Sequence, residues 1–136
     1  AEETPKQAAA RLLRTRKLAG VLEDEYRQHE WSFEETFAQL TARFKIAHSA
    51  TSFAAFEKDA MVEHGDAMGA TVLNLLRAER GLAALEAPEF TKAAALSDHH
   101  ISESTPELRL FETLVKVASD AARLQRGVEW LKTQCA

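Results

Sequence analysis

The sequence contains little of what builds sheets, disulfides or membrane spans. Cys135 is the single cysteine among 136 residues, so neither an internal disulfide nor a multi-cysteine metal site can form. Valine and isoleucine together number eight against 25 alanines. Because β-branched residues favour strands and alanine favours helices, this balance predicts helices alone. With only three prolines and five glycines, the chain has few places where a helix must end.

Charge and hydropathy exclude further classes of protein. No run of eighteen apolar residues occurs, so we expect no transmembrane segment. The formal net charge of −4 gives no general attraction to nucleic acid, which we do not expect as a partner. The chain begins with Ala1 rather than Met, which is compatible with a processed exported or organellar protein and also with a cytoplasmic one.

Two capping boxes predict where the first helices begin. In "TPKQ" the Thr4 hydroxyl can accept from the backbone of Gln7 while the Gln7 side chain reaches back. The helix that starts there should run to about Gln28. "SFEE" repeats the device with Ser32 and Glu35, so we predict that a second helix begins at this point.

Apolar residues recur at helical spacing along both segments. The first track consists of Ala8, Leu12, Ala19, Leu22 and Tyr26, with polar Thr15 as a gap; the second consists of Phe33, Phe37, Leu40, Phe44 and Ala47. Beyond Ala47 the phase slips, because Phe53 and Phe56 fall on a different face. We therefore predict a kink or short break at "HSATS", with a continuous helix containing a stutter as the alternative.

The remainder of the chain divides at its prolines. The segment from Phe53 to about Leu85 is helix-like, and a short helix over about 89–96 and a polar loop, "SDHHISES", follow Pro88. "STPEL" then starts a last helix that should run from Pro106 to Thr133. Its apolar residues step by four and three through three heptads, which predicts packing at about 20° to another helix. These residues form the seam of the last helix: Leu110, Leu114, Val117, Ala121, Leu124, Val128 and Leu131.

One short stretch, "RFKIAH", carries a chemical hypothesis. Arg43 and His48 have the spacing of the Arg-x4-His motif, and in this they resemble HEPN-type ribonucleases, which are also small and all-helical. The resemblance implies metal-independent RNA cleavage by these two side chains. On one regular helix, however, residues five apart lie about 140° from each other around the axis. The two side chains would then flank the apolar track instead of meeting.

Other catalytic and metal-binding patterns are missing from the sequence. No histidine has a glutamate three residues before it, which di-iron helical bundles require, and the pair His99 and Glu103 falls in the predicted loop. The sequence contains no HExxH, GxSxG, P-loop or GxGxxG motif. We therefore expect no cofactor, no metal site and no catalytic residue.

Two features suggest contact with other proteins. "GDAMG" spaces two glycines so that helix backbones can approach closely, although a local unwinding or loop explains it equally well. We predict a partner contact around it, at Met61, Gly65, Met68, Gly69 and Val72. The basic residues Arg11, Arg14, Arg16 and Lys17 could bind an acidic surface, nucleic acid included. Acidic residues at 23–25 follow them, however, which is typical of a solvated helix face.

These observations predict an all-α fold, an elongated antiparallel bundle of about four helices, as a single domain over residues 1–136. Residues 33–85 form either one long kinked helix or two. We expect a non-enzymatic protein that acts through protein–protein interaction, as a structural or assembly subunit or an adaptor, with a protein partner or a second copy. The alternatives are the ribonuclease that uses Arg43 and His48, and a ligand-sensing bundle of an exported protein, which would need an apolar pocket between helices.

Overall fold

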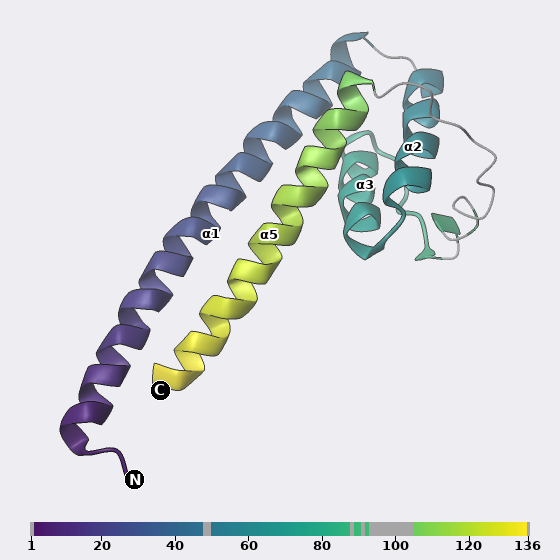
Figure 1. The fold of residues 1–136 in the computed structure, drawn as a ribbon. Helices are drawn as coiled ribbons and strands as arrows, with labels where there is room; N and C mark the ends of the chain where they lie inside the picture. Colours follow the sequence, from purple (N-terminus) through teal and green to yellow (C-terminus); the bar gives the residue numbers. More distant parts are fainter. Residues whose placement is uncertain (1, 48–49, 88, 91, 93–104, 136) are drawn as a thin grey trace.

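The structure, a computed structural model, describes residues 2–47, 50–87, 89, 90, 92 and 105–135. Four α-helices account for most of these residues, which include no strand: α1 (Pro5–Ala47), α2 (Ala50–His64), α3 (Ala67–Glu79) and α5 (Pro106–Cys135). α1 and α5 run antiparallel side by side, and α2 and α3 lie beside one end of this pair (Figure 1). The predicted all-α antiparallel bundle is confirmed. None of the described helices combines the length and hydropathy that a membrane crossing requires.

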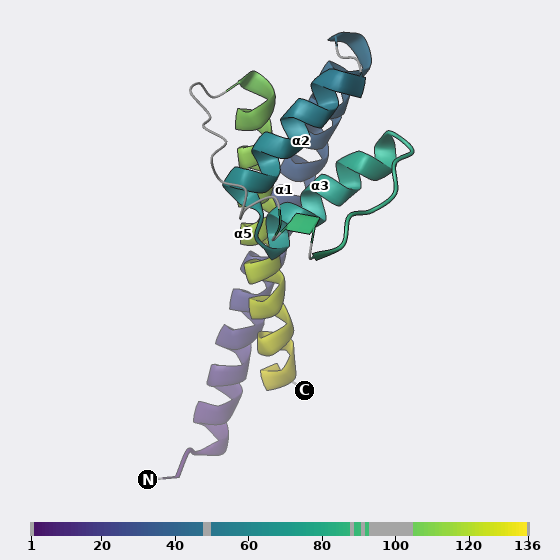
Figure 2. The same cartoon turned by 90° about the vertical axis from the view of Figure 1, so that its right-hand side faces the viewer.

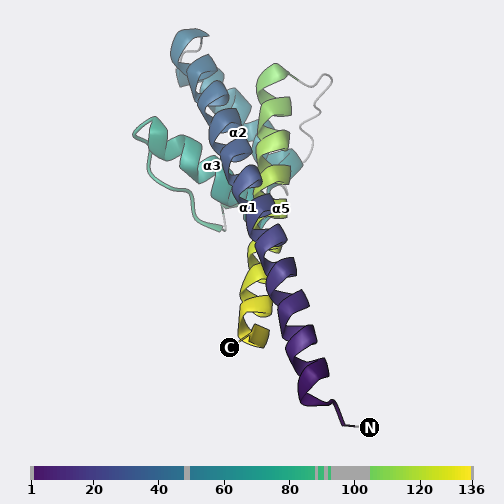
Figure 3. The ribbon, with the colours of Figure 1, turned by 90° about the vertical axis from the view of Figure 1, so that its left-hand side faces the viewer.

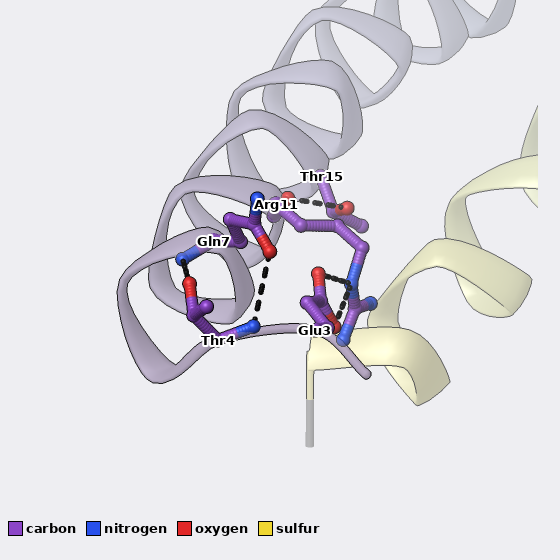
Figure 4. Close-up of polar contacts among 5 residues, drawn as sticks. All are labelled: Glu3, Thr4, Gln7, Arg11 and Thr15. Carbon is purple, nitrogen blue, oxygen red and sulfur yellow. Dashed lines mark hydrogen bonds and ion pairs between the residues drawn. The ribbon is translucent and has the colours of Figure 1, made fainter. Parts of the chain in front are cut away.

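α1 begins with the predicted capping box (Figure 4). The backbone N–H of Thr4 donates to Oε1 of Gln7 at 3.0 Å, and the N–H of Gln7 donates to Oγ1 of Thr4 at 3.2 Å. Glu3 and Arg11 form an ion pair of 3.1 Å, and the Thr15 hydroxyl donates to the carbonyl of Arg11. These local bonds stabilise turns of α1 that extend past the C-terminal end of α5 (Figure 1).

The predicted break between a first and a second helix is wrong. α1 continues through Gln28 and Ser32 as one helix of 43 residues, so no helix begins at the predicted capping box of Ser32. The stretch "QHEW" contains neither glycine nor proline, and nothing in the backbone ends a helix there. His29 is half-buried and links Tyr26 to Phe33 in steps of three and four, so the face that packs on α5 has no interruption.

α5 provides the other side of this contact. It begins at Pro106 as predicted, and the N–H of Leu108 donates to Oγ1 of Thr105 at 3.2 Å. The predicted seam faces inward along its length: Leu114, Val128 and Leu131 are buried, and its other four residues are half-buried. Burial is complete only at Leu114, because α2 and α3 add a further layer at that end of the pair.

Polar contacts across the seam fix the alignment of α1 against α5. Lys132 forms an ion pair with Glu23 near the end of the pair that is distant from α2 and α3. Farther along, Nε2 of His29 lies 4.0 Å from Oδ2 of Asp120. A shift of α5 along α1 would separate both pairs. They therefore favour this antiparallel register, as polar residues do in coiled coils.

The hydrophobic core lies where α2 and α3 pack on the α1–α5 pair. Its aromatic rings meet edge to face, with centroids 5.1 Å apart for Phe44 and Phe53 and 5.6 Å apart for Phe56 and Phe111. Aliphatic residues of α1, α3 and α5 fill the space around these rings. The buried cluster consists of Leu40, Phe44, Phe53, Phe56, Ala60, Val72, Leu73, Leu76, Phe90, Leu108, Phe111 and Leu114.

The segment from Phe53 to Leu85 is not one helix, because the chain breaks at "GDAMG". α2 ends at His64, and α3 begins at Ala67 with Asp66 as its N-cap, whose carboxylate accepts from the N–H of Gly69 at 2.8 Å. A Cβ on Gly69 would lie 1.7 Å from the His64 carbonyl oxygen. The interpretation as a local interruption of the helix is therefore confirmed. The close approach that Gly69 permits is to the chain's own backbone, and contact of this segment with a partner stays a prediction.

α3 ends at Glu79, earlier than the sequence suggested. Gly81 has a φ of 72°, a left-handed conformation that glycine adopts without strain, and the chain reverses there. The Asn74 side chain then holds the returning segment, because its amide bonds both the carbonyl and the N–H of Leu85, at 3.1 and 2.9 Å. Of the predicted helix over 89–96, the described residues 89, 90 and 92 are helical; its other residues and the predicted polar loop lie outside the described residues.

Candidate functional site

Arg43 lies near the C-terminal end of α1 with a half-exposed side chain. Its Nη1 is 3.5 Å from Oε1 of Glu107 on α5, so a carboxylate already accompanies the arginine. His48 lies outside the described residues. The ribonuclease hypothesis therefore stays a prediction.

The predicted partner-contact residues fall around the start of α3. Val72 is 1% exposed within the core, and Gly69 is buried against the backbone of His64. Met61, Gly65 and Met68 are half-buried. Partner contact here stays a prediction, and the two methionines are the side chains that another molecule could reach without rearrangement of the core.

Histidines in the described ranges pair with single carboxylates. His29 contacts Asp120, and Nε2 of His64 lies 3.3 Å from Oε1 of Glu112. Within these ranges, no three His, Cys, Asp or Glu side chains are grouped as metal ligands. His99 and Glu103 lie outside the described ranges.

A cavity of about 240 Å³ lies between the C-terminal part of α1, the start of α2 and the end of α3. Its apolar lining comes from Phe44, Phe53 and Leu76. The charged side chains that complete it are Lys45, Glu79 and Arg80. The guanidinium of Arg80 lies over the Phe53 ring, 4.5 Å from the centroid, as a cation–π contact. The cavity is thus apolar inside, with two cations and one carboxylate at its side. The excess of positive charge suits a ligand with an apolar body and an anionic group.

Beside this cavity, Glu57 of α2 is buried and forms an ion pair with Arg77 of α3. Arg77 also donates through Nε to the carbonyl of Ala83 at 2.7 Å, which holds the segment after α3 in place. Removing one partner of such a pair leaves a buried charge without compensation, a strongly destabilising change. The pair's geometry therefore indicates a structural role.

Large apolar side chains are exposed along the part of the α1–α5 pair that α2 and α3 do not cover. The core cluster and its packed neighbours reach only to Phe33 on α1 and Ala118 on α5. We call the remainder, residues 5–31 of α1 and 120–135 of α5, the arm. Its exposed large apolar residues are Leu13 (56%), Leu18 (51%), Val21 (54%), Trp31 (63%) and Trp130 (62%).

Three of these residues share one face of α1 on the side away from α5. This face is uncovered in Figure 3, where α1 lies in front of α5 and no other described segment crosses its N-terminal half. The ten exposed residues at helical spacing that define this outer face are Lys6, Ala10, Leu13, Lys17, Gly20, Val21, Asp24, Gln28, Trp31 and Glu35. A Cβ added to Gly20 would meet no atom within 4 Å, so packing within the chain does not require this glycine.

No family model, no curated protein and no solved structure matches the chain. The cavity and the exposed faces of the arm are therefore the features of the fold that point to a function.

The sequence interpretation missed both of these features. The cavity joins residues that are far apart in the chain, Phe44 and Arg80, so no local pattern marks it. The exposed tryptophans did leave a signal. Trp31 falls out of phase with the apolar track of α1, and Trp130 is out of phase with the seam of α5.

Proposed function

We propose that this chain is a non-enzymatic helical protein that works through protein–protein contact, as a structural or assembly subunit or an adaptor, and that the arm is its binding element. The observation that carries the proposal is the exposure of both tryptophans of the chain, Trp31 at 63% and Trp130 at 62%. Tryptophan is enriched at the centres of protein interfaces, where its large apolar surface leaves water.

The shape of the arm supports this role. Figure 2 shows α2 and α3 grouped around one end of the α1–α5 pair, while the other end carries no additional helix. The ion pair of Lys132 with Glu23 and the burial of Leu131 keep α5 on α1 close to its last turn. The arm is therefore a preformed surface, and binding to it costs little conformational entropy.

Capture of partners from the native source tests this proposal. The wild-type chain, Trp31→Ala and Trp130→Ala are compared with the control Lys116→Ala, which changes an exposed residue of α5 outside the arm. We expect a specific partner that the wild type and the control retain and that at least one tryptophan variant loses. Circular dichroism should show the same helix content in all four chains. Capture that both tryptophan variants retain in full would contradict the assignment of the arm.

A second function, binding of a small amphipathic anion, is favoured by the cavity beside Arg80. A ligand-sensing bundle needs an apolar pocket between helices, and the cavity has apolar walls. Its two cations, Lys45 and Arg80, outnumber its one carboxylate, Glu79. A short-chain fatty acid added to the purified protein should raise the melting temperature if the cavity binds it, because a ligand that binds only the folded state stabilises that state. The variant Arg80→Gln should reduce the shift. An equal shift in both chains would contradict this second function.

A further inference from the structure

We propose that the outer face of α1 binds the outer face of α1 in a second copy of this chain, with the two helices antiparallel. The inference rests on the proposed function, because it names one partner for a face of α1 that lies in the arm except for Glu35. In this arrangement the middle of the interface lies at Gly20 and Val21, where the two helices cross. A two-fold axis relates the copies, so every contact occurs twice, as in most homodimers.

Charge complementarity selects this arrangement. The N-terminal half of the outer face carries Lys6 and Lys17, and its C-terminal half carries Asp24 and Glu35. When the helices cross at Gly20 in opposite directions, Lys6 faces the partner's Glu35 and Lys17 faces the partner's Asp24. The two-fold axis repeats both pairs. In a parallel arrangement each of these residues would face its own copy, and every one of the contacts would be repulsive.

Apolar contacts supply the attraction between the charged positions. Trp31 of one copy lies opposite the partner's Ala10, a small residue that leaves room for the indole ring. Leu13 lies next to this contact, and Val21 packs at the crossing point. The three large side chains are more than half exposed in the single chain, so pairing would remove their apolar surface from water.

Gly20 is the second, independent observation. A glycine inside a helix lowers its stability relative to alanine, and in the single chain no neighbouring atom requires the absence of a side chain at this position. At a helix crossing, a glycine allows the two backbones to approach closely. The glycine therefore has a structural reason in the dimer that it lacks in the monomer.

The arrangement is also compatible with the rest of the fold. The contact from Lys6 to Glu35 spans about 44 Å at 1.5 Å per residue. Because the helices are antiparallel, α2 and α3 of the two copies lie at opposite ends of the dimer and do not compete for space. Trp130 belongs to α5 and lies outside the outer face of α1, so it stays available for a different partner.

Sedimentation equilibrium of the purified full chain tests the proposal. We expect a dimer whose dissociation constant rises about tenfold or more in Lys6→Glu/Lys17→Glu, because four attractive pairs per dimer become repulsive. Asp24→Lys/Glu35→Lys should weaken the dimer for the same reason. The matched control is Arg16→Glu/Lys116→Glu, which makes the same change in charge at exposed positions outside the outer face and should leave the dissociation constant within about twofold of the wild type.

A charge-swap experiment makes the test specific for orientation. When the two double variants are mixed, Glu at positions 6 and 17 of one chain faces Lys at positions 35 and 24 of the other, and the unchanged residues pair in the same way. A heterodimer should therefore form with close to wild-type affinity. Gly20→Leu, which blocks the close approach without any change of charge, should also weaken the dimer. Circular dichroism would verify that every variant is folded.

A wild-type chain that stays monomeric up to its solubility limit would overturn the proposal. A dimer that the charge reversals do not weaken, or a mixture that does not form heterodimers, would overturn it as well. The proposed function fails separately. A monomeric chain that still captures a partner through Trp130 would contradict the dimer and support the arm as a binding element. A dimer that captures no partner would support the dimer and contradict the arm as an adaptor surface.

Discussion

The guanidinium carbon of Arg80 lies 4.5 Å from the centroid of the Phe53 ring and so connects the end of α3 to the start of α2 beside an apolar cavity. A cation–π contact that is partly desolvated contributes roughly 0.5–2 kcal/mol. Arg80→Ala should therefore lower the free energy of unfolding by about this amount, measured by urea denaturation. Arg16→Ala, at an exposed position without an aromatic contact in the described chain, is the control and should change it by less than about 0.5 kcal/mol.

The seam of α5 should respond unequally to truncation. Leu114 is fully buried under α2 and α3, so Leu114→Ala should destabilise by about 2–5 kcal/mol. Leu124 lies in the arm and is only half-buried, so Leu124→Ala should cost less than about 2 kcal/mol. The exposed Leu75 provides the control, with an expected change within about 0.5 kcal/mol for Leu75→Ala. Equal losses at Leu114 and Leu124 would mean that the arm is as well packed as the core.

Two helical glycines should respond in opposite directions to alanine. At Gly69 the new Cβ would lie 1.7 Å from the His64 carbonyl oxygen, so Gly69→Ala should destabilise strongly, by more than about 2 kcal/mol. At Gly20 nothing lies within 4 Å, and alanine should stabilise the monomer by about 1 kcal/mol. Thermal unfolding measures both changes. The substitutions are made in the Lys6→Glu/Lys17→Glu chain, where the proposed dimer is weakened, so that the measured change in stability belongs to the monomer. A stable Gly69→Ala chain would contradict the close backbone approach at the start of α3.

Local signals in the sequence predicted the helix starts that depend on neighbouring residues. Thr4 and Thr105 cap α1 and α5 through bonds within four residues. The similar signal at Ser32 failed because continuous packing of α1 on α5 stabilises the helix across that point. A capping box contributes about 1 kcal/mol, which a helix interface easily exceeds.

The cavity and the outer face needed three-dimensional information. Arg80 follows α3, Phe44 belongs to α1, and only the packing of α2 and α3 on the α1–α5 pair brings the two together. Exposure of Trp31 likewise depends on which side of α1 receives α5. The spacing of apolar residues distinguishes the face of α1 that packs on α5 from the outer face. It does not show that the outer face is left uncovered.

The ion pair between Lys132 and Glu23 predicts a dependence of stability on pH. The hydrogen bond from Lys132, together with its charge, lowers the pKa of Glu23 below its ordinary value of 4.5. Because the lower pKa belongs to the folded state, the stabilisation is present above pH 4.5 and is lost as the pH falls through the folded-state value. Urea denaturation should show wild type more stable than Lys132→Ala near neutral pH, with a smaller difference well below pH 4.5. A constant difference would mean that Lys132 acts only through its aliphatic stem; Lys116→Ala serves as the control.

The last prediction separates a binding protein from an enzyme. If "RFKIAH" is only the end of a helix, the purified chain should not cleave single-stranded RNA. The two test variants are Arg43→Ala and His48→Ala; Arg43→Ala should keep the chain folded, because the Arg43 side chain is half-exposed. A ribonuclease that uses Arg43 and His48 would cleave RNA in the presence of a chelator. Either substitution would then reduce the rate by about 10²–10⁴, the usual contribution of a general acid or base. Lys45→Ala is the control, since it removes a neighbouring exposed cation that the motif does not use. We expect no cleavage. Cleavage in the presence of a chelator that is lost in both variants and kept in Lys45→Ala would contradict the binding proposal and support an enzyme. A contaminating nuclease would not respond to these two substitutions.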